Sequence, residues 1–388
     1  MKKSLWVLLF LTAVSPAWAA KKITVQQLQE LLTSLKAANK PDADVAGALK
    51  QVELTEQLTR ATMNSLAGYA PGPGTTAQFY VLEARSAILP PPPADLPANP
   101  APDAATQTAL LGKAADYATK TFAQLPHLTA TRTTLRFQDN TQAVAASSGI
   151  HSGAEYGSMA DPNLVIASQF VTYINSAQTD VTLQNGAELN PLVNDKTRWG
   201  ANGYIALLGQ SPVLGDVFQE AQSAGKIVFL RWESVNGKTA AVFTFSVDKK
   251  KTHYAVNYCC FPDIDQVGVA KFSAPTPLGG AGGVKGNLQT YTNYKNFKAN
   301  VPYHGEFFID PGTGVVVRLV TQADFKDSDV VRKEDQRIDY TPVSVGDKTL
   351  VLPTEALVNT EVVPNGDSGA GKFSIRHTLF VAEYKDYK

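Results

Sequence analysis

Apolar residues in the first third of the chain recur with a helical spacing. Over residues 24–39, Val25, Leu28 and Leu32 follow the i, i+3, i+7 pattern, and Thr24 is placed to cap the helix. The same spacing predicts further helices over residues 40–52, 54–69, 77–89 and 105–125. A proline-rich stretch at residues 90–103 interrupts the series and predicts a stiff, extended connector. We therefore expect a helical region over residues 20–125.

From residue 126 onward the pattern changes to short β-type segments separated by turn residues. Residues 128–139 are rich in Thr and Leu and predict a strand, and Asn236-Gly237 lies between two apolar runs, as in a short hairpin. Asp310, Pro311, Gly312 and Gly314 predict a second hairpin turn. One helix is expected within residues 211–225, and Gly225 marks its C-terminal end. This half, residues 126–388, predicts a large curved antiparallel sheet, a half-barrel with one or two packed helices, so the fold class is α+β.

The first nineteen residues have the pattern of a secretory signal peptide. Lys2 and Lys3 form a basic start, an apolar run follows, and "AWA" at residues 17–19 is a small-x-small cleavage site, so cleavage is expected after Ala19. A membrane anchor needs about 18 or more apolar residues, which this run does not reach. No later segment is long and apolar enough to span a bilayer. The mature chain is expected to be periplasmic or secreted, without a transmembrane span.

The charge balance restricts the class of partner. The chain contains 35 Lys and Arg residues and 35 Asp and Glu residues. A protein whose main partner is nucleic acid or an anionic membrane surface usually has a basic excess, so neither is expected here. With 44% hydrophobic and 18% charged residues the composition is globular, and a mature length of about 370 residues suggests two domains, or one domain with a substantial extension.

Several phrases resemble those of a known family. The segments "VQQLQELL", "LPHLTATRTTLRFQD", "RWGANGYIALLGQSPVLGDVFQEA", "HYAVNYCC" and "GEFFIDPGTGVVVRLVTQAD" are similar, in order, to a family of uncharacterised secreted bacterial proteins. The resemblance covers nearly the whole mature chain. Its β half looks like the fold of the lipoprotein carrier LolA and the stress regulator RseB, in which a curved sheet wraps around helices and can hold acyl chains. That resemblance implies a carrier-like fold, and it implies a hairpin at Asp310–Gly314 rather than a catalytic site.

Cys259 and Cys260 are the only cysteines and are adjacent in sequence. In an oxidising compartment they can form a vicinal disulfide, which is strained because adjacent Cα atoms lie about 3.8 Å apart while ordinary disulfides need roughly 4.4–6.8 Å. They can also be two reduced thiols that pack on opposite faces of a strand. A redox or soft-metal site is a third alternative, although metal ligands are usually separated by two or more residues. The three alternatives stay open at this point.

The sequence shows no coherent catalytic constellation. It lacks G-x-S-x-G, the Walker spacing and the Ca²⁺-loop pattern, and its five histidines are scattered. We therefore expect no enzyme activity, no cofactor and no metal. Trp199, Tyr204, Phe229 and Trp232 are candidates for an apolar pocket, although most aromatics in a sheet are simply core residues.

Three functional hypotheses follow. The first is an exported, non-enzymatic protein that binds a lipid, an acyl chain or a partner peptide in its curved sheet, and it predicts an apolar cavity of several hundred Å³ between sheet and helix. The second is a redox or metal-linked protein centred on Cys259 and Cys260. The third is a structural envelope protein without a small-molecule ligand.

Overall fold

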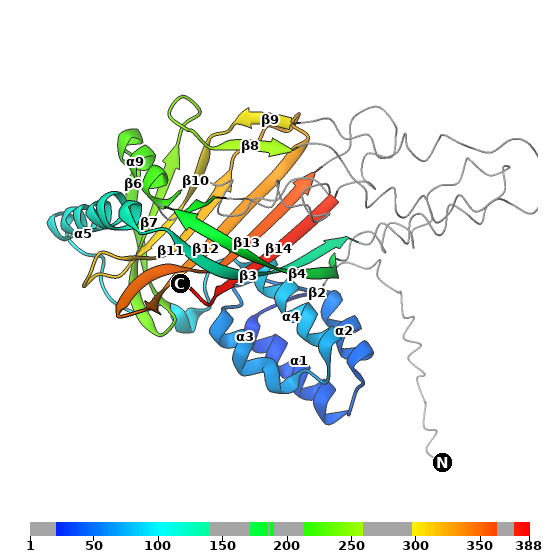
Figure 1. The fold of residues 1–388 in the computed structure, drawn as a ribbon. Helices are drawn as coiled ribbons and strands as arrows, with labels where there is room; N and C mark the ends of the chain where they lie inside the picture. The colour runs from blue at the N-terminus through cyan, green and yellow to red at the C-terminus, as the bar shows by residue number, and fades with distance from the viewer. Residues whose placement is uncertain (1–20, 140–170, 185–186, 190–212, 259–296, 363–375) are drawn as a thin grey trace, which may run out of the picture.

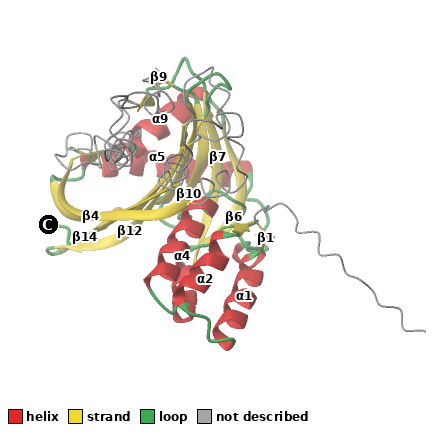
Figure 2. Ribbon diagram, turned by 90° about the vertical axis from the view of Figure 1, so that its right-hand side faces the viewer, coloured by secondary structure: helices red, strands yellow, loops and turns green. Residues whose placement is uncertain are grey.

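A computed structural model describes residues 21–139, 171–184, 187–189, 213–258, 297–362 and 376–388. These residues form an α+β fold in which one large antiparallel sheet carries helices on both of its faces (Figures 1 and 2). The expected fold class and the antiparallel sheet are confirmed. Cys259, Cys260, Trp199 and Tyr204 lie outside the described residues.

Within the described residues, ten strands form the main sheet in the order β5-β4-β3-β14-β13-β12-β11-β10-β7-β6. Their bounds are β3 (Leu128–Asp139), β4 (Val171–Gln184), β5 (Ala187–Glu188), β6 (Ile227–Val235), β7 (Lys238–Val247), β10 (Tyr303–Ile309), β11 (Val316–Ala323), β12 (Val331–Val345), β13 (Lys348–Val362) and β14 (Arg376–Lys385). A separate antiparallel pair is formed by β8 (Ala255–Tyr258) and β9 (Phe297–Asn300). The main sheet curves strongly but does not close, because β5 and β6 are its two outer strands (Figure 2).

Glycines make the hairpin turns of the sheet possible. Asn236 and Gly237 both have positive φ angles, 51° and 77°, and join β6 to β7 as the sequence predicts. Gly346 has a φ of 57° in the turn between β12 and β13. These tight turns place consecutive strands side by side, which accounts for the antiparallel pairs β6–β7, β10–β11 and β12–β13.

The concave face of the sheet is filled by the helical segments α5 (Ala104–Asp116), η3 (Tyr117–Thr121), η4 (Phe122–Gln124) and α9 (Leu214–Ala224) (Figure 2). The ring of Phe218 on α9 lies 4.7 Å from that of Phe307, which stacks on Phe245 at 4.4 Å. The ring of Phe122 meets Tyr340 edge to face at 5.4 Å. The largest hydrophobic core of the described residues is therefore between these helices and the concave face.

A separate small core belongs to what we call the helical unit, residues 21–86. It contains β1 (Lys21–Ile23), α1 (Val25–Ala37), α2 (Asp42–Lys50), β2 (Val52–Leu54), α3 (Arg60–Leu66), η1 (Ala67–Tyr69) and α4 (Pro73–Ser86). Thr24 caps α1 in a capping box with Gln27, as expected from the sequence. The unit lies on the convex face, where α4 packs against the sheet through Val81 and Ala84 (Figures 1 and 2).

The third helix is shorter than its apolar pattern predicts. We expected helix over residues 54–69, but α3 begins only at Arg60. Val52–Leu54 instead pairs in parallel with β1, and Leu54 and Leu58 are buried in the core of the helical unit. Leu54 lies in a short strand and Leu58 in a loop, yet both are buried. Their spacing in sequence is the same as that of apolar residues on one face of a helix, so the prediction of helix before Arg60 was wrong.

Residues 87–103, which include the proline-rich stretch 90–103, form the connector that passes around the edge of the sheet. Ile88 packs on the convex face with Val242 and Phe308, and η2 (Pro93–Asp95) contacts β6. The indole N–H of Trp232 then donates to the carbonyl of Pro100 at 2.8 Å, just before α5 begins on the concave side. The two helical parts of the predicted region 20–125 therefore cover opposite faces of one sheet.

Candidate functional site

The predicted apolar pocket is represented in the described residues by Phe229 and Trp232, both on the outer strand β6. Both side chains are half-buried, their rings lie 5.5 Å apart, and Phe229 also meets Phe243 edge to face at 5.5 Å. Together with the hydrogen bond from Trp232 to Pro100, these contacts fasten the sheet edge to the core and to the connector. Trp199 and Tyr204, the other two candidates, lie outside the described residues.

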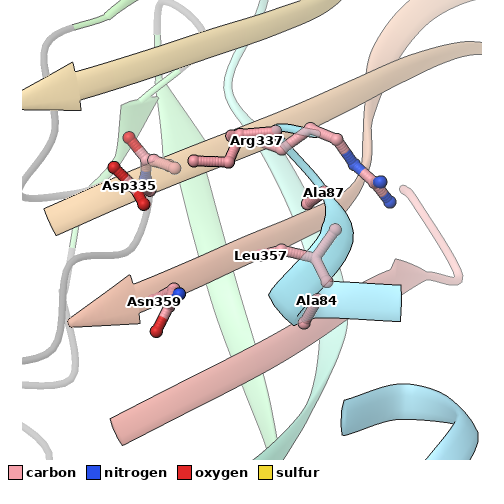
Figure 3. A pocket seen from close by; sticks show the side chains of 8 residues that line it. Ala84, Ala87, Asp335, Arg337, Leu357 and Asn359 are labelled. Carbon is pink, nitrogen blue, oxygen red and sulfur yellow. The ribbon is translucent and has the colours of Figure 1, made fainter. Parts of the chain in front are cut away.

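Two cavities among the described residues lie outside the concave face. One, of about 10 Å³, is between the end of α4 and strands β12 and β13, where Ala84, Ala87, Arg337 and Leu357 line it (Figure 3). The other is an open hollow of about 250 Å³ on the helical unit, beside Lys36, Lys40 and Tyr69. Neither matches the expected apolar cavity of several hundred Å³ between sheet and helix.

The Asp310–Gly314 segment makes the turn between β10 and β11. A carboxylate oxygen of Asp310 accepts hydrogen bonds from the backbone N–H groups of Gly312 and Thr313, at 2.9 and 3.0 Å. Pro311 follows Asp310 in the turn, and Gly314 has a φ of 78° and lies so close to α5 that an added Cβ would be 2.4 Å from the Cβ of Lys113. The segment thus shapes a tight turn against a helix and presents no catalytic arrangement.

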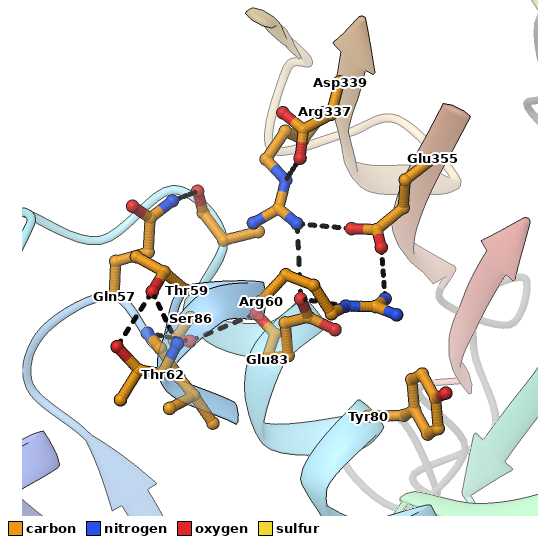
Figure 4. Close-up of polar contacts among 12 residues, drawn as sticks. Gln57, Thr59, Arg60, Thr62, Tyr80, Glu83, Ser86, Arg337, Asp339 and Glu355 are labelled. Carbon is orange, nitrogen blue, oxygen red and sulfur yellow. Dashed lines mark hydrogen bonds and ion pairs between the residues drawn. The ribbon is translucent and has the colours of Figure 1, made fainter. Parts of the chain in front are cut away.

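Charged side chains form a buried network where the helical unit meets the convex face. We call it the ionic cluster: Arg60 of α3, Glu83 of α4, Arg318 of β11, Arg337 and Asp339 of β12, Glu355 of β13 and Glu383 of β14. Figure 4 labels five of them, Arg60, Glu83, Arg337, Asp339 and Glu355. The side chains of Arg337 and Glu83 are 1% and 0% exposed. Buried charged side chains are normally paired, because an unpaired buried charge is costly. The geometry of the ion pairs therefore determines how much the cluster contributes to stability.

Two arginines and two glutamates form the centre of the cluster. Arg60 Nε donates to Glu83 Oε1 at 2.8 Å, and Arg60 Nη2 contacts Glu355. Arg337 Nη2 donates to Glu355 Oε1 at 2.6 Å and lies 3.5 Å from Glu83 Oε1. Each carboxylate therefore faces both guanidinium groups, and the ring of contacts joins two helices of the helical unit to two strands of the sheet (Figure 4).

The outer members of the cluster hold the central arginines in place. Asp339 accepts from Arg318 Nε at 2.5 Å and lies 3.4 Å from Arg337 Nε. Glu383 accepts from Arg60 Nη1 at 2.9 Å. Burial raises the pKa of Asp339, but the positive charges of Arg318 and Arg337 lower it by more. The pKa of Asp339 is therefore below its ordinary value.

The pKa of Glu355 is shifted in the opposite direction to that of Asp339. Burial, followed by the charge of Glu83, raises its pKa to about 7, although Arg337 and Arg60 act in the opposite direction. Two carboxylates that share the same cationic partners resist simultaneous ionisation, which is the usual origin of such a shift. Burial and the charge of Glu83 therefore favour the protonated form of Glu355.

The edge of the sheet is the second notable feature. Within the described residues β6 hydrogen-bonds along one side only, to β7, and it exposes two large apolar side chains, Val228 at 60% and Leu230 at 47%. The register shifts between Phe229 and Arg231, so Leu230 is the extra residue of a β-bulge. The connector lies along the edge near Trp232, and no described strand pairs with the N-terminal half of β6 on its outer side.

A metal site and a membrane-spanning helix are both absent from the part of the chain that the structure describes. Its His, Asp and Glu residues include no group of three or more arranged to hold a metal ion. Among the described helices, none combines the length and the apolar character needed to cross a bilayer.

Comparison with known proteins assigns no relative: no family model, no curated protein and no solved structure matches the chain.

Sequence reasoning did not find the ionic cluster. Arg337 and Asp339 alternate with Ile338 and Tyr340 along β12, and such alternation normally indicates one buried and one solvated face. The available signal was Glu83, a single charge among Val81, Leu82 and Ala84 in α4. A charge within an apolar helical stretch faces either solvent or a buried partner, and only the packing of α4 on the sheet distinguishes the two.

Proposed function

We propose that the chain is an exported, non-enzymatic binding protein that recognises an extended partner peptide at the edge strand β6. The observation that carries this proposal is the open N-terminal half of β6, with Val228 and Leu230 exposed beside one unpaired strand edge. Natural sheets usually protect such edges, and an exposed apolar edge is the surface to which an extended peptide adds as a further strand. Export rests on the predicted signal peptide, and the carrier-like half-barrel on the resemblance noted above.

The filled concave face favours a peptide over a lipid or acyl chain. An acyl chain needs an enclosed apolar space, and among the described residues α5 and α9 pack directly into the hydrophobic core of the concave face. The peptide alternative requires only the sheet edge. Lys249 and Lys250 are exposed where β7 ends, next to the ion pair of Lys226 with Asp248, so these two lysines favour a partner with acidic residues next to its apolar ones.

Selection from a library of extended peptides tests the proposal. Wild-type protein is the bait, and a variant with Val228→Lys and Leu230→Lys is the counter-bait, because lysine on an edge strand opposes pairing. Both positions are exposed, so the variant is expected to fold with a stability within about 0.5 kcal/mol per substitution of the wild type. Thr239→Lys, at an exposed position of β7, is the matched control.

The expected result is a set of peptides that bind the wild type and the control but not the double variant. These peptides should also slow amide hydrogen exchange of residues 227–230. Peptides that bind all three proteins equally, or that protect other strands, would contradict the proposal. Lipid that remains bound to the wild type in native mass spectrometry would instead support the apolar-ligand alternative.

The proposed export also has a consequence for the oxidation state of Cys259 and Cys260. An oxidised, vicinal pair is expected for an exported chain, and intact-mass spectrometry with and without reductant measures it as a gain of about two mass units on reduction. Unchanged mass would indicate free thiols and would remove the main reason to expect a redox role.

A further inference from the structure

Strand β6 contains one residue more than its pairing with β7 requires. Arg231 is paired with Val242 and Phe229 with Phe243, so Leu230 has no counterpart on β7. Val242 and Phe243 are consecutive in β7, whereas Phe229 and Arg231 are two positions apart in β6. A β-bulge of this kind bends its strand and either redirects a side chain or ends the strand pairing. Leu230 is the extra residue, and its apolar side chain is 47% exposed.

Contacts on both faces of the sheet hold the two neighbours of Leu230 in place. The two Nη atoms of Arg231 donate to the two carboxylate oxygens of Glu306 at 3.1 and 2.9 Å, on the convex face. The ring of Phe229 lies 5.5 Å from that of Phe243, which belongs to the concave core. Residues two positions apart in a regular strand share one face. Because Phe229 and Arg231 are anchored on opposite faces, the bulge between them is fixed at Leu230.

The sheet itself does not need Leu230. Without this residue, Phe229 and Arg231 would be consecutive, and consecutive residues of a strand point to opposite faces, as the two anchors require. They would then oppose the consecutive residues Phe243 and Val242 in a regular antiparallel pair. An exposed apolar residue that the strand pairing can lose without losing either anchor has a reason other than the fold.

We propose that Leu230 is the specificity-determining residue of the peptide site on β6, where the bulge ends the pairing of the bound strand and presents the leucine to one of its apolar side chains. This inference rests on the proposed function and names the feature that selects the peptide. Beyond the bulge, the connector lies along the edge, where the indole N–H of Trp232 donates to the carbonyl of Pro100 at 2.8 Å. A bound strand therefore pairs with residues 226–229 and contacts Leu230 at its end.

The occupant that fits this edge is a short extended peptide with consecutive apolar residues and an acidic residue beside them. Val228 is exposed on one side of β6, and the half-buried Phe229 lies on the other. A strand added here meets apolar side chains on both of its faces, so it needs an uninterrupted apolar run rather than an alternating one. Lys249 and Lys250 are exposed where β7 ends and provide the charge that an acidic residue complements.

Two variants of the full mature chain test the role of Leu230. Deletion of Leu230 removes the bulge and keeps both anchors, whereas Leu230→Ser keeps the bulge and removes the apolar side chain. The probe is a fluorophore-labelled peptide selected on the wild type as described above, and fluorescence anisotropy measures its Kd. Each variant should bind it at least about fivefold more weakly, because the peptide loses the apolar surface of a half-exposed leucine. Thr239→Ser, at an exposed position of β7, is the matched control and should bind as the wild type does.

Two further measurements accompany the binding assay. The urea midpoint of the deletion variant should not be lower than that of the wild type, because the deletion removes a residue without a pairing partner on β7. In the wild type, the bound peptide should slow amide exchange of residues 227–229 and leave residues 232–235 unchanged.

The outcomes separate this inference from the proposed function. A peptide that binds the wild type, the deletion variant and Leu230→Ser with equal Kd refutes the role of Leu230 and leaves the edge site standing. A wild type that binds no selected peptide refutes both. A deletion variant that unfolds shows that the sheet needs the residue, and one that self-associates while keeping its affinity assigns the bulge to protection of the edge; either result overturns the inference.

Discussion

Replacing Arg337 with methionine should destabilise the protein more than any exposed substitution. The guanidinium of Arg337 contacts Glu355 at 2.6 Å, Asp339 at 3.4 Å and Glu83 at 3.5 Å, and its side chain is 1% exposed. After Arg337→Met, three buried carboxylates would share the two remaining arginines, Arg60 and Arg318. Removing one partner of a buried ion pair costs about 3–5 kcal/mol, and we expect a loss in this range at pH 8.

A double variant separates this loss from simple packing. Arg337→Met combined with Glu355→Leu leaves two matched pairs, Arg60 with Glu83 and Arg318 with Asp339. Because uncharged side chains of similar volume often replace a buried ion pair without loss, the double variant should be more stable than the single one by about 1–3 kcal/mol. The single variant should also lose less stability at pH 5.5, where a proton on Glu355 removes one of the unpaired charges.

Urea unfolding followed by far-UV circular dichroism measures these differences at both pH values, with each variant compared with wild type. The reasoning would be refuted by a single variant that loses less than about 1 kcal/mol at pH 8. It would equally be refuted by a double variant whose loss is the sum of its two single losses, because independent sites add and coupled charges do not.

Two further predictions concern backbone packing. Asp42 accepts hydrogen bonds from the hydroxyl of Thr75 and from the N–H groups of Thr75 and Gly74, which lower its pKa, and it so caps α4 from a neighbouring helix. Asp42→Ala should lower the melting temperature in calorimetry, and the stabilising effect of Asp42 should be lost as the pH falls below its ordinary pKa of 3.8. A melting temperature equal to wild type would argue against this cap. Gly305→Ala should be poorly tolerated, because an added Cβ would lie 1.9 Å from the carbonyl oxygen of Val320, and overpacking of this kind costs at least about 1–3 kcal/mol. Soluble variant protein with unchanged stability would show that the two strands separate easily there.

Local signals in the sequence predicted local structure well. Strand β3 has the expected bounds, residues 128–139, and the predicted turns have positive φ angles at Asn236, Gly237 and Gly314, as their residue types favour. Gly225 ends α9 in the left-handed conformation, as its position predicts. In each case the neighbouring residues alone determine the conformation.

Features that depend on distant residues were not predictable from one sequence. The alternation of Arg337 and Asp339 with apolar residues looked like a solvated strand face, because nothing local shows that α4 covers it. The separation of α4 and α5 onto opposite faces likewise depends on how the connector passes around β6. The candidate site was missed for this reason: its members come from residues 60 to 383 and meet only in the folded chain.

The central place of β14 has a consequence for the order of folding. Strand β3 pairs with β14, more than 200 residues later in the chain, and β14 also pairs with β13. Until residues 376–385 have been synthesised, the sheet can exist only as two fragments with unpaired inner edges, and joining them requires the closure of a very long loop. A growing chain is thus prevented from completing its fold early. If the proposed export takes place, this delay would keep the sheet from assembling before the chain has crossed the membrane.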